Sequence, residues 1–367
     1  VYLYASAIHN VTKQQFFEVN VMEYIVEKLA KGQNLSHKDF RTLLDSNCEK
    51  LRTELADKAV SVRSSVFGKD IYIRGLIEFT NYCKNNCYYC GIRAGNSNAV
   101  RYRLDMNDIL SCCENGYSLG FRTFVLQGGE DPFFTDERLI PIIRDIRAAY
   151  PDCAITLSLG ERARESYQAL FDAGADRYLL RHETADFSHY ALLHPPELSP
   201  ARRQQCLRDL KDIGYQVGAG MMIGAPGQSA QTLAEDMLFL KELDPEMVGI
   251  GPFIPQKDTP FANEAPGSAE LTCFLLSIIR IIQPNILLPA TTALGSISPL
   301  GREEGLKSGA NVLMPNLSPA GVRDKYILYD GKICTGEESA QCIKCLETRI
   351  SSTGYKLSFE RGDIKLI

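Results

Sequence analysis

The hydrophobic pattern divides the chain into a helical beginning and a longer alternating part. Apolar residues recur at helical spacing over 21–30, and a Ser36-x-x-Asp39 capping pattern precedes a second helical run over 40–44. A third amphipathic run follows. The pattern therefore predicts a helical cap over residues 1–66.

After this cap, short apolar runs alternate with amphipathic helical stretches, which is the pattern of βα units and a parallel sheet. Eight such strands with their helices, over roughly 250 residues, make a (β/α)8 TIM barrel. A doubly wound open sheet is the alternative, but it requires a reversal of strand order that one sequence does not reveal. We expect an α/β fold with the barrel over 67–325 and a C-terminal extension over 326–367. The predicted strands are 71–79, 123–127, 154–158, 177–181, 216–222, 247–251, 287–291 and 311–314, and the predicted helices are 106–119, 137–150, 163–173, 200–213, 229–243, 269–282 and 302–308.

Polar and glycine-rich segments follow several predicted strands. In a barrel, such loops line the carboxyl-end face, where active sites sit. The segments are 81–98, 128–132, 160–161, 182–184 and 224–228.

The composition is that of a globular protein. The chain is 45% hydrophobic and 23% charged, which excludes disordered and fibrous classes. Its 40 basic and 45 acidic residues give a net charge of −5, and the basic residues are scattered. This distribution gives no indication of nucleic-acid or membrane binding and favours a small-molecule ligand. No apolar stretch approaches the length of a membrane span and no secretory signal is visible, so we expect a cytoplasmic protein.

Three of the twelve cysteines form the strongest chemical signal, the C-x3-C-x2-C run of Cys83, Cys87 and Cys90. In a cytoplasmic chain, clustered cysteines indicate metal ligands rather than disulfides. Three thiolates are one short of closing a four-iron cluster, and this leaves one iron open to a substrate or cofactor. The alternatives are a zinc site with a distant fourth ligand and three incidental thiols. No second ligand pair follows at a typical zinc spacing, so we favour the cluster.

This run, with Tyr89 before its last cysteine and in the first βα loop of a predicted barrel, resembles the radical S-adenosylmethionine (SAM) enzymes. The resemblance implies an enzyme whose 4Fe–4S cluster is held by Cys83, Cys87 and Cys90, with the amine and carboxylate of SAM on the fourth iron. Reductive cleavage of SAM would then yield a 5′-deoxyadenosyl radical. A low-potential electron donor such as flavodoxin or ferredoxin is implied as a partner.

Eight segments in order resemble one branch, the HydE family of FeFe-hydrogenase maturases, near methylornithine synthase and more distant from biotin synthase. The resemblance implies an organometallic iron–carbonyl–cyanide precursor carrying cysteine as substrate, and other hydrogenase maturation proteins as partners. Biotin synthase would need further cysteines inside the barrel, where Ala154 and Gly218 stand. The segments are IYIRGLIEFTNYCKNNCYYCGIR, FVLQGGEDP, ITLSLGE, DRYLLRHET, GYQVGAGMMIGAPGQ, MVGIGPFIPQKDTP, PATTALG and ANVLMPN.

The resemblance also implies contacts to the cofactor. The turn Gly128-Gly129-Glu130 would contact the amino group of SAM, Glu183 would bind its ammonium and Arg203 its carboxylate. Arg181 shares a face with Glu183 if the strand stays extended, and His182 then points the other way. Without the resemblance, a tight turn and an internal ion pair explain these residues equally well. The other candidate cofactor and cavity residues are Gln127, Thr156, Ser158, Met222, Met247, Ile250, Thr291, Thr292, Met314, Tyr326 and Tyr329.

A second cysteine group, Cys334, Cys342 and Cys345, lies beyond the predicted barrel. HydE proteins often carry an accessory 2Fe–2S or 4Fe–4S cluster at this place. The alternative is a zinc site that pins the extension.

The remaining thiols and two histidines are predicted to be structural. We expect Cys48, Cys112, Cys113, Cys206 and Cys273 to be buried, and Cys153 to face away from the barrel interior. We expect His182 and His194 to be hydrogen-bonded rather than ligands.

Two other functions stay open. A methylornithine synthase-like lysine mutase would present carboxylates to the amines of lysine and has no evident use for the second cysteine group. A non-catalytic iron–sulfur carrier or scaffold would not bind SAM.

Overall fold

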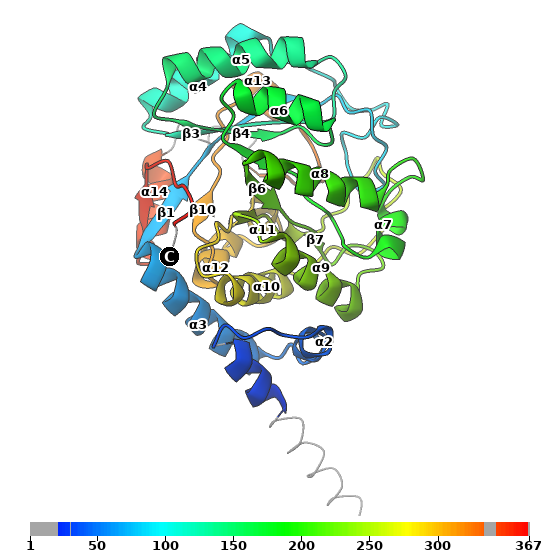
Figure 1. The fold of residues 1–367 in the computed structure, drawn as a ribbon, viewed down its shortest axis with the longest axis vertical. Coiled ribbons are helices and arrows are strands. Elements are labelled where there is room, and N and C mark those ends of the chain that lie inside the picture. Colours follow the sequence, from blue (N-terminus) through cyan, green and yellow to red (C-terminus); the bar gives the residue numbers. More distant parts are fainter. Residues whose placement is uncertain (1–20, 30, 334–342, 366–367) are drawn as a thin grey trace, which may run out of the picture.

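The computed structural model describes residues 21–29, 31–333 and 343–365. Parallel strands lie at its centre and helices surround them (Figure 1). The strands are β1 (Asp70–Ile73), β2 (Gly75–Thr80), β3 (Thr123–Gly128), β4 (Ala154–Ser158), β5 (Arg177–Leu179), β6 (Gln216–Ala219), β7 (Met222–Ile223), β8 (Met247–Val248), β9 (Gly251–Pro252), β10 (Val312–Leu313) and β11 (Lys356–Ser358). The helices are α2 (His37–Asp45), α3 (Glu49–Phe67), α4 (Met106–Ser118), α5 (Asp136–Ala149), α6 (Arg164–Asp172), α7 (Phe187–Leu193), α8 (Pro200–Ile213), α9 (Ala230–Leu243), α10 (Ala269–Ile282), α11 (Thr292–Ile297), α12 (Gly301–Lys307), α13 (Ala320–Arg323) and α14 (Ile343–Ser352).

Three predicted strands are each divided in two. The run 71–79 breaks at Arg74 into β1, which pairs with β10 and β11, and β2, which begins the six-stranded sheet β2-β3-β4-β5-β6-β8. The run 216–222 breaks at Gly220, whose φ of 152° lies outside the range of an ordinary strand residue. The run 247–251 divides into β8 and β9, and β9 pairs with β7.

The ring closes through isolated bridges rather than continuous ladders. Met247 bridges Leu287, Pro289 bridges Val312, and β10 pairs with β1. The predicted strand 287–291 therefore lies in its expected place between β8 and β10, but the prediction of a regular strand there is wrong. Pro289 has no N–H group to donate to a ladder. The TIM-barrel-like α/β fold is confirmed.

Capping side chains mark where helices begin. The Ser36 hydroxyl accepts a hydrogen bond from the Asp39 N–H (3.2 Å), and the Asp39 carboxylate accepts one from the Ser36 N–H (2.9 Å). The Ser199 cap and Pro200 at the first position start α8, which has the predicted bounds. The helices α2 and α3 pack against α9 and α10, so they lie along the outer helices of the barrel (Figure 1).

Residues 356–363 cross the amino end of the barrel. The strand β11, which the hydrophobic pattern did not predict, pairs in parallel with β1. The carbonyl of Arg361 accepts hydrogen bonds from Thr123 (2.8 Å) and Arg177 (2.9 Å), which are the first residues of β3 and β5. Arg177 also pairs with Asp363 at 2.6 Å. The last described residues thus cover the end of the barrel opposite the loops.

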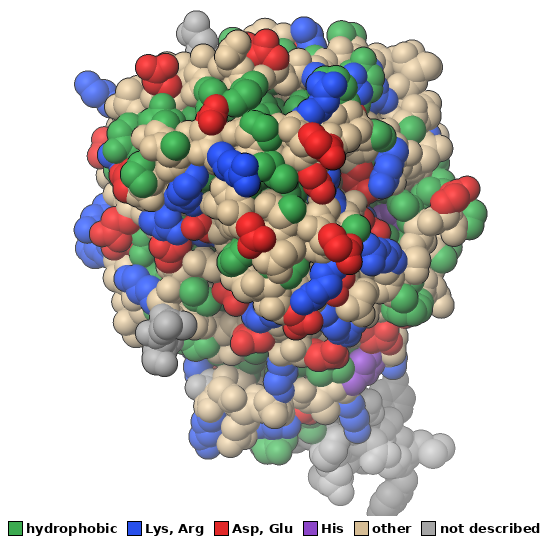
Figure 2. Space-filling view, turned by 45° about the horizontal axis from the view of Figure 1, so that its top comes forward, with side chains coloured by type: hydrophobic (Ala, Val, Ile, Leu, Met, Phe, Trp, Pro, Cys, Tyr) green, Lys and Arg blue, Asp and Glu red, His purple; other side chains and the backbone are tan. Residues whose placement is uncertain are grey.

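Charged side chains of both signs are interspersed over the face shown in Figure 2. Across the described part of the chain, every helix is too short or too polar to cross a membrane.

A buried ion pair joins the C-terminal segment 325–333 to the barrel. The Lys332 Nζ lies 2.6 Å from the Glu78 Oε1, and the two side chains are 6% and 1% exposed. Asn316 donates to the other oxygen of Glu78 (2.9 Å), and Lys332 also donates to the carbonyl of Tyr326 (2.8 Å). The pair therefore holds this segment against β2.

Replacing Lys332 with Met should destabilise the protein more than the double replacement of Glu78 with Leu and Lys332 with Met. Removal of one partner leaves a buried unpaired charge at a cost of about 3–5 kcal/mol, whereas an apolar pair is often close to neutral. Urea unfolding measures the free energies. The exposed Lys31–Glu27 pair, with side chains 58% and 62% exposed, is the control. Its removal should cost less than about 1 kcal/mol. A Lys332→Met variant as stable as the parent would contradict the role of the pair.

Candidate active site

A cavity of about 300 Å³ opens at the carboxyl end of the barrel. Its walls come from the loops after the strands and from the C-terminal segment 325–333. A cavity of this size holds a small organic molecule. The predicted site residues that line it are Cys83, Cys87, Cys90, Gln127, Gly128, Gly129, Glu130, Ser158, Arg181, Glu183, Arg203, Met222, Thr291, Tyr326 and Tyr329.

Five other candidate residues do not line this cavity. Thr156 is fully buried in β4, and Ile250 lies in the main hydrophobic core between β8 and β9. Met247 and Met314 pack in a separate apolar cluster. Thr292 is the first residue of α11 and stands next to Thr291, which does reach the cavity.

The structure adds cavity residues that the sequence did not indicate. Asn85 lies within the cysteine run itself, and Leu328 lies between the two predicted tyrosines, so position was the available signal for both. The other additions are mostly apolar or glycine, which carry no chemical signal. They are Ile92, Leu179, Leu180, Phe253, Ile254 and Ala293. Four further lining residues lie in segments that the sequence did indicate, namely Tyr89 in the cysteine run, Gly160 in the loop after β4, and Gly251 and Pro252 in a strand that by resemblance lies along the adenine.

The cysteine loop is held from two sides. The Lys84 N–H donates to the carbonyl of Glu130 after β3, and the Gly91 N–H donates to the carbonyl of Leu328, both at 2.9 Å. The loop is therefore fixed between a βα turn and the C-terminal segment.

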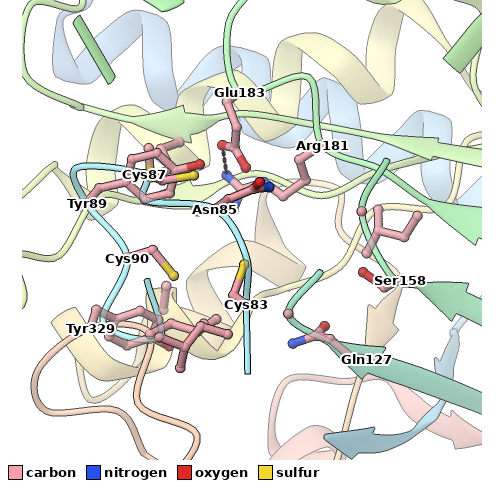
Figure 3. A pocket seen from close by; sticks show the side chains of 18 of the residues that line it. Cys83, Asn85, Cys87, Tyr89, Cys90, Gln127, Ser158, Arg181, Glu183 and Tyr329 are labelled. Carbon is pink, nitrogen blue, oxygen red and sulfur yellow. Dashed lines mark ion pairs between the residues drawn. The ribbon is translucent and has the colours of Figure 1, made fainter. Parts of the chain in front are cut away.

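The thiols of the loop point toward the same part of the cavity (Figure 3). Burial raises the pKa of Cys83, Cys87 and Cys90, that of Cys87 to about 12, and the neighbouring thiols add to the rise for Cys87 and Cys90. A cationic centre that binds these sulfur atoms stabilises their thiolate form and so opposes the rise in pKa.

Within the described ranges, no three His, Cys, Asp or Glu side chains lie close enough together to hold a single metal ion. In a four-iron cluster, each thiolate binds a different iron, so the ligands need not meet at a single point.

Gly129 lets the cysteine loop pack against the turn after β3. A Cβ atom at this position would lie 2.2 Å from the Tyr82 carbonyl oxygen and 2.8 Å from the Cys83 Cβ. The sequence suggested that glycine admits a ligand here. The structure shows that the close neighbour is the loop itself.

Arg181 and Glu183 face each other, although the strand has already ended. The extended geometry does not persist, because β5 stops at Leu179 and Glu183 has a φ of 65°. The Arg181 Nη2 lies 3.4 Å from the Glu183 Oε2 (Figure 3). These two residues thus form an internal ion pair.

Arg203 is held by two carboxylates. Its Nε lies 2.8 Å from the Glu161 Oε1, and its Nη2 lies 3.7 Å from the Glu130 Oε1. The Glu161 N–H also donates to the Glu130 Oε1 (3.0 Å). Burial raises the pKa of Glu161, and Arg203 opposes that rise. The sequence marked Glu161 only as part of a loop after β4.

The two histidines are hydrogen-bonded, as predicted. His194 contacts the carbonyl of Tyr190 (3.0 Å) and the hydroxyl of Tyr89 (3.1 Å), and burial lowers its pKa to about 3. His182 accepts a hydrogen bond from the Gly220 N–H (3.3 Å).

Most of the predicted structural thiols are buried, namely Cys112, Cys113, Cys153 and Cys206. The prediction is wrong for Cys48, which is exposed because it caps α3 rather than lying on its apolar face, and Cys273 is only partly buried.

Cys345 lies in α14 and takes part in a disulfide bond. Cys334 and Cys342 lie outside the described residues, so the second cysteine site stays a prediction.

The cavity residues fit the cluster and the zwitterionic cofactor that the sequence resemblance implies. Arg181 Nε and Thr291 Oγ1 are buried and have no hydrogen-bond partner among the described residues, and the same holds for Thr156 Oγ1. Buried polar atoms of this kind usually have a partner, and a polar ligand in the cavity would supply one to the first two. The three thiols provide the soft donors that an iron–sulfur cluster requires.

Comparisons with known proteins agree on one superfamily. The sequence profile of the radical SAM superfamily matches residues 77–240. The chain is 43% identical over 343 residues to the FeFe-hydrogenase maturase subunit HydE of Thermotoga maritima, covering 94% of this chain and 97% of that protein. It is 28% identical over 332 residues to the 3-methylornithine synthase of Methanosarcina acetivorans, covering 90% and 92%.

Solved structures share the fold. The structure of methylornithine synthase (PylB) has a TM-score of 0.77 at 26% identity and covers 91% of this chain and 97% of its own. The FeFe-hydrogenase maturase HydG from Carboxydothermus hydrogenoformans has a TM-score of 0.78 at 20% identity and covers 97% and 83%.

Replacing Gly129 with Ala should displace the cysteine loop, because the added methyl group meets backbone that cannot move freely. We expect a loss of about 1–3 kcal/mol in the free energy of unfolding and a lower iron content after anaerobic reconstitution. Gly321→Ala is the matched control, because a Cβ there meets nothing within 4 Å. Full iron content and full stability in Gly129→Ala would show that the close approach is unimportant.

Proposed function

The chain belongs to the HydE family of radical SAM enzymes, and we propose that it acts in the maturation of the FeFe-hydrogenase active site. The proposed substrate is a small organometallic iron–carbonyl–cyanide precursor that carries cysteine. The observation that carries the proposal is the identity of 43% across 94% of the chain. The three thiols at the rim of the cavity support it.

Cys83, Cys87 and Cys90 would hold the 4Fe–4S cluster at this rim. When bound, the cluster and SAM supply a 5′-deoxyadenosyl radical, which is formed by reductive cleavage of SAM.

Charged residues of the chain would orient SAM. Glu183 would bind its ammonium, and Arg203 would bind its carboxylate through charge-assisted hydrogen bonds. Glu161 and Glu130 keep the guanidinium of Arg203 beside the cavity. Because these groups are already placed and buried, little reorganisation accompanies binding.

Other residues would enclose the reaction. Gln127, Ser158 and Thr291 present polar groups to the cavity, and Tyr326, Leu328 and Tyr329 form the wall contributed by the C-terminal segment. Tyr326 is 2% exposed, and the Gln127 amide lies 3.4 Å from its hydroxyl. A closed wall of this kind keeps water from a reactive intermediate.

We also propose the protein partners that this chemistry requires. A low-potential one-electron donor, of flavodoxin or ferredoxin type, would reduce the cluster, and other hydrogenase maturation proteins would supply or receive the organometallic species. Once the disulfide bond of Cys345 is reduced to the thiolate that iron requires, Cys334, Cys342 and Cys345 would hold an accessory 2Fe–2S or 4Fe–4S cluster.

A lysine mutase of methylornithine synthase type is the second candidate. The carboxylates of Glu130 and Glu183 in the cavity wall favour it, since amines of a lysine substrate need such partners. Both carboxylates, however, already face arginines, Glu130 facing Arg203 and Glu183 facing Arg181.

Addition of the reconstituted enzyme, SAM and reductant should activate an apo-hydrogenase in a defined maturation mixture. The Cys87→Ala variant should form no 5′-deoxyadenosine and give no activation, whereas Cys48→Ala, which changes an exposed cysteine, should behave like the parent. Hydrogen production and chromatography of deoxyadenosine are the measurements. Conversion of lysine to methylornithine, without activation of the hydrogenase, would favour the mutase instead.

Replacing Glu183 with Gln should weaken SAM binding by about 1.5–3 kcal/mol, because a hydrogen bond to a charged group is lost. Anaerobic calorimetric titration of reconstituted protein measures the dissociation constant. An unchanged constant would contradict the ammonium contact.

A further inference from the structure

The structure assigns a positioning role to Asp236 and His182, which hold Glu183 in the conformation that aims its carboxylate into the cavity. This role rests on the proposed function, in which Glu183 binds the ammonium of SAM. Both side chains are 0% exposed, and neither lines the cavity. They therefore act on the cofactor site through Glu183 rather than by direct contact.

The backbone of Glu183 is the feature that needs support. Its φ of 65° lies in the left-handed region, where residues other than glycine are rare. Asp244 is the other non-glycine residue with positive φ in the described ranges, and it ends helix α9, where this conformation is common. Glu183 ends no helix. Such a conformation persists at a functional site when the surrounding structure imposes it.

One oxygen of Asp236 contacts the chain on both sides of Glu183. The Ala185 N–H donates to the Asp236 Oδ1 at 2.5 Å. The His182 Nε2 lies 3.4 Å from the same oxygen. These two contacts hold residues before and after the left-handed position.

The tautomer of His182 follows from its other contact. Its Nδ1 accepts a hydrogen bond from the Gly220 N–H (3.3 Å), so the proton of the neutral ring is on Nε2 and faces Asp236. Gly220 also accepts the Glu183 N–H through its carbonyl, at 3.0 Å. The bend after β5 is thus tied to the segment between β6 and β7 and to helix α9.

Helix α9 supplies a second contact to the same imidazole. The Phe239 ring packs against His182 with centroids 5.0 Å apart. Phe239 follows Asp236 by three positions, so both lie on one face of α9. The imidazole therefore lies between the Asp236 carboxylate and the Phe239 ring. The backbone on both sides of Glu183 is thereby fixed, and the Glu183 carboxylate lies 3.4 Å from Arg181 at the cavity wall.

The test is a double-variant cycle on SAM binding. Asp236→Ala should raise the dissociation constant for SAM about 10-fold or more, with iron content unchanged, because a displaced Glu183 loses its charged hydrogen bond to the ammonium. Asp236→Asn keeps an oxygen acceptor for the Ala185 N–H and should restore most of the affinity. In a Glu183→Gln background, Asp236→Ala should change the constant by less than about 3-fold, because coupled residues are not additive. Additive losses would overturn the positioning role.

Asp209→Ala is the matched structural control. Asp209 is also a buried helical carboxylate, 7% exposed, and it accepts a hydrogen bond from Gln205 at 3.0 Å. Its replacement should lower the thermal midpoint and leave the SAM dissociation constant unchanged. If Asp236→Ala does not fold, His182→Phe takes its place in the same cycle, and additivity with Glu183→Gln again overturns the role.

A thermal cycle separates this role from the proposed function. If Glu183→Gln binds SAM as well as the parent, the proposed ammonium contact has failed. The positioning role is then tested with Glu183→Gly, because glycine adopts the left-handed conformation without strain. This replacement should raise the thermal midpoint of the parent. It should not raise that of Asp236→Ala, in which the residue that imposes the conformation is already missing. An equal rise in both backgrounds would contradict it.

Discussion

The site depends on one constraint, the closed parallel arrangement of the strands. In a parallel ring, all the carboxyl ends meet at one rim. Cys83 after β2, Glu130 after β3, Glu161 after β4 and Glu183 after β5 are brought together for this reason. The isolated bridges at 287–291 complete the ring, and the C-terminal segment 325–333 then packs over the rim and against the cysteine loop.

Buried charge is the second organising feature of the rim. Arg203 lies between Glu161 and Glu130, Glu183 faces Arg181, whose side chain is one-third exposed, and Glu78 faces Lys332. Buried charges without partners are costly, so each pair supports the placement of both its members. Two of these pairs present groups of opposite sign to the cavity, which suits a zwitterionic cofactor. The third holds the segment that forms part of the cavity wall.

Sequence identity and site geometry support different conclusions about function. The resemblance to HydE concerns the whole chain, whereas the structural likeness to methylornithine synthase and HydG concerns the fold. Within the cavity, the thiols and charged pairs relate to the cofactor chemistry that radical SAM enzymes share. Leu179, Phe253 and Leu328 add apolar surface to the same cavity.

The sequence by itself determined the features that neighbouring residues encode. The spacing of Cys83, Cys87 and Cys90, the capping pair of Ser36 and Asp39, and the bounds of α8 and α10 follow from local periodicity and local chemistry. Tertiary structure decided the rest. The left-handed backbone of Glu183 depends on Asp236, which follows it in the chain by more than fifty positions, and Arg203 selects Glu161 only after two βα units have packed. Such contacts have no local pattern, because their free energy arises only when distant strands and helices bury the same groups together.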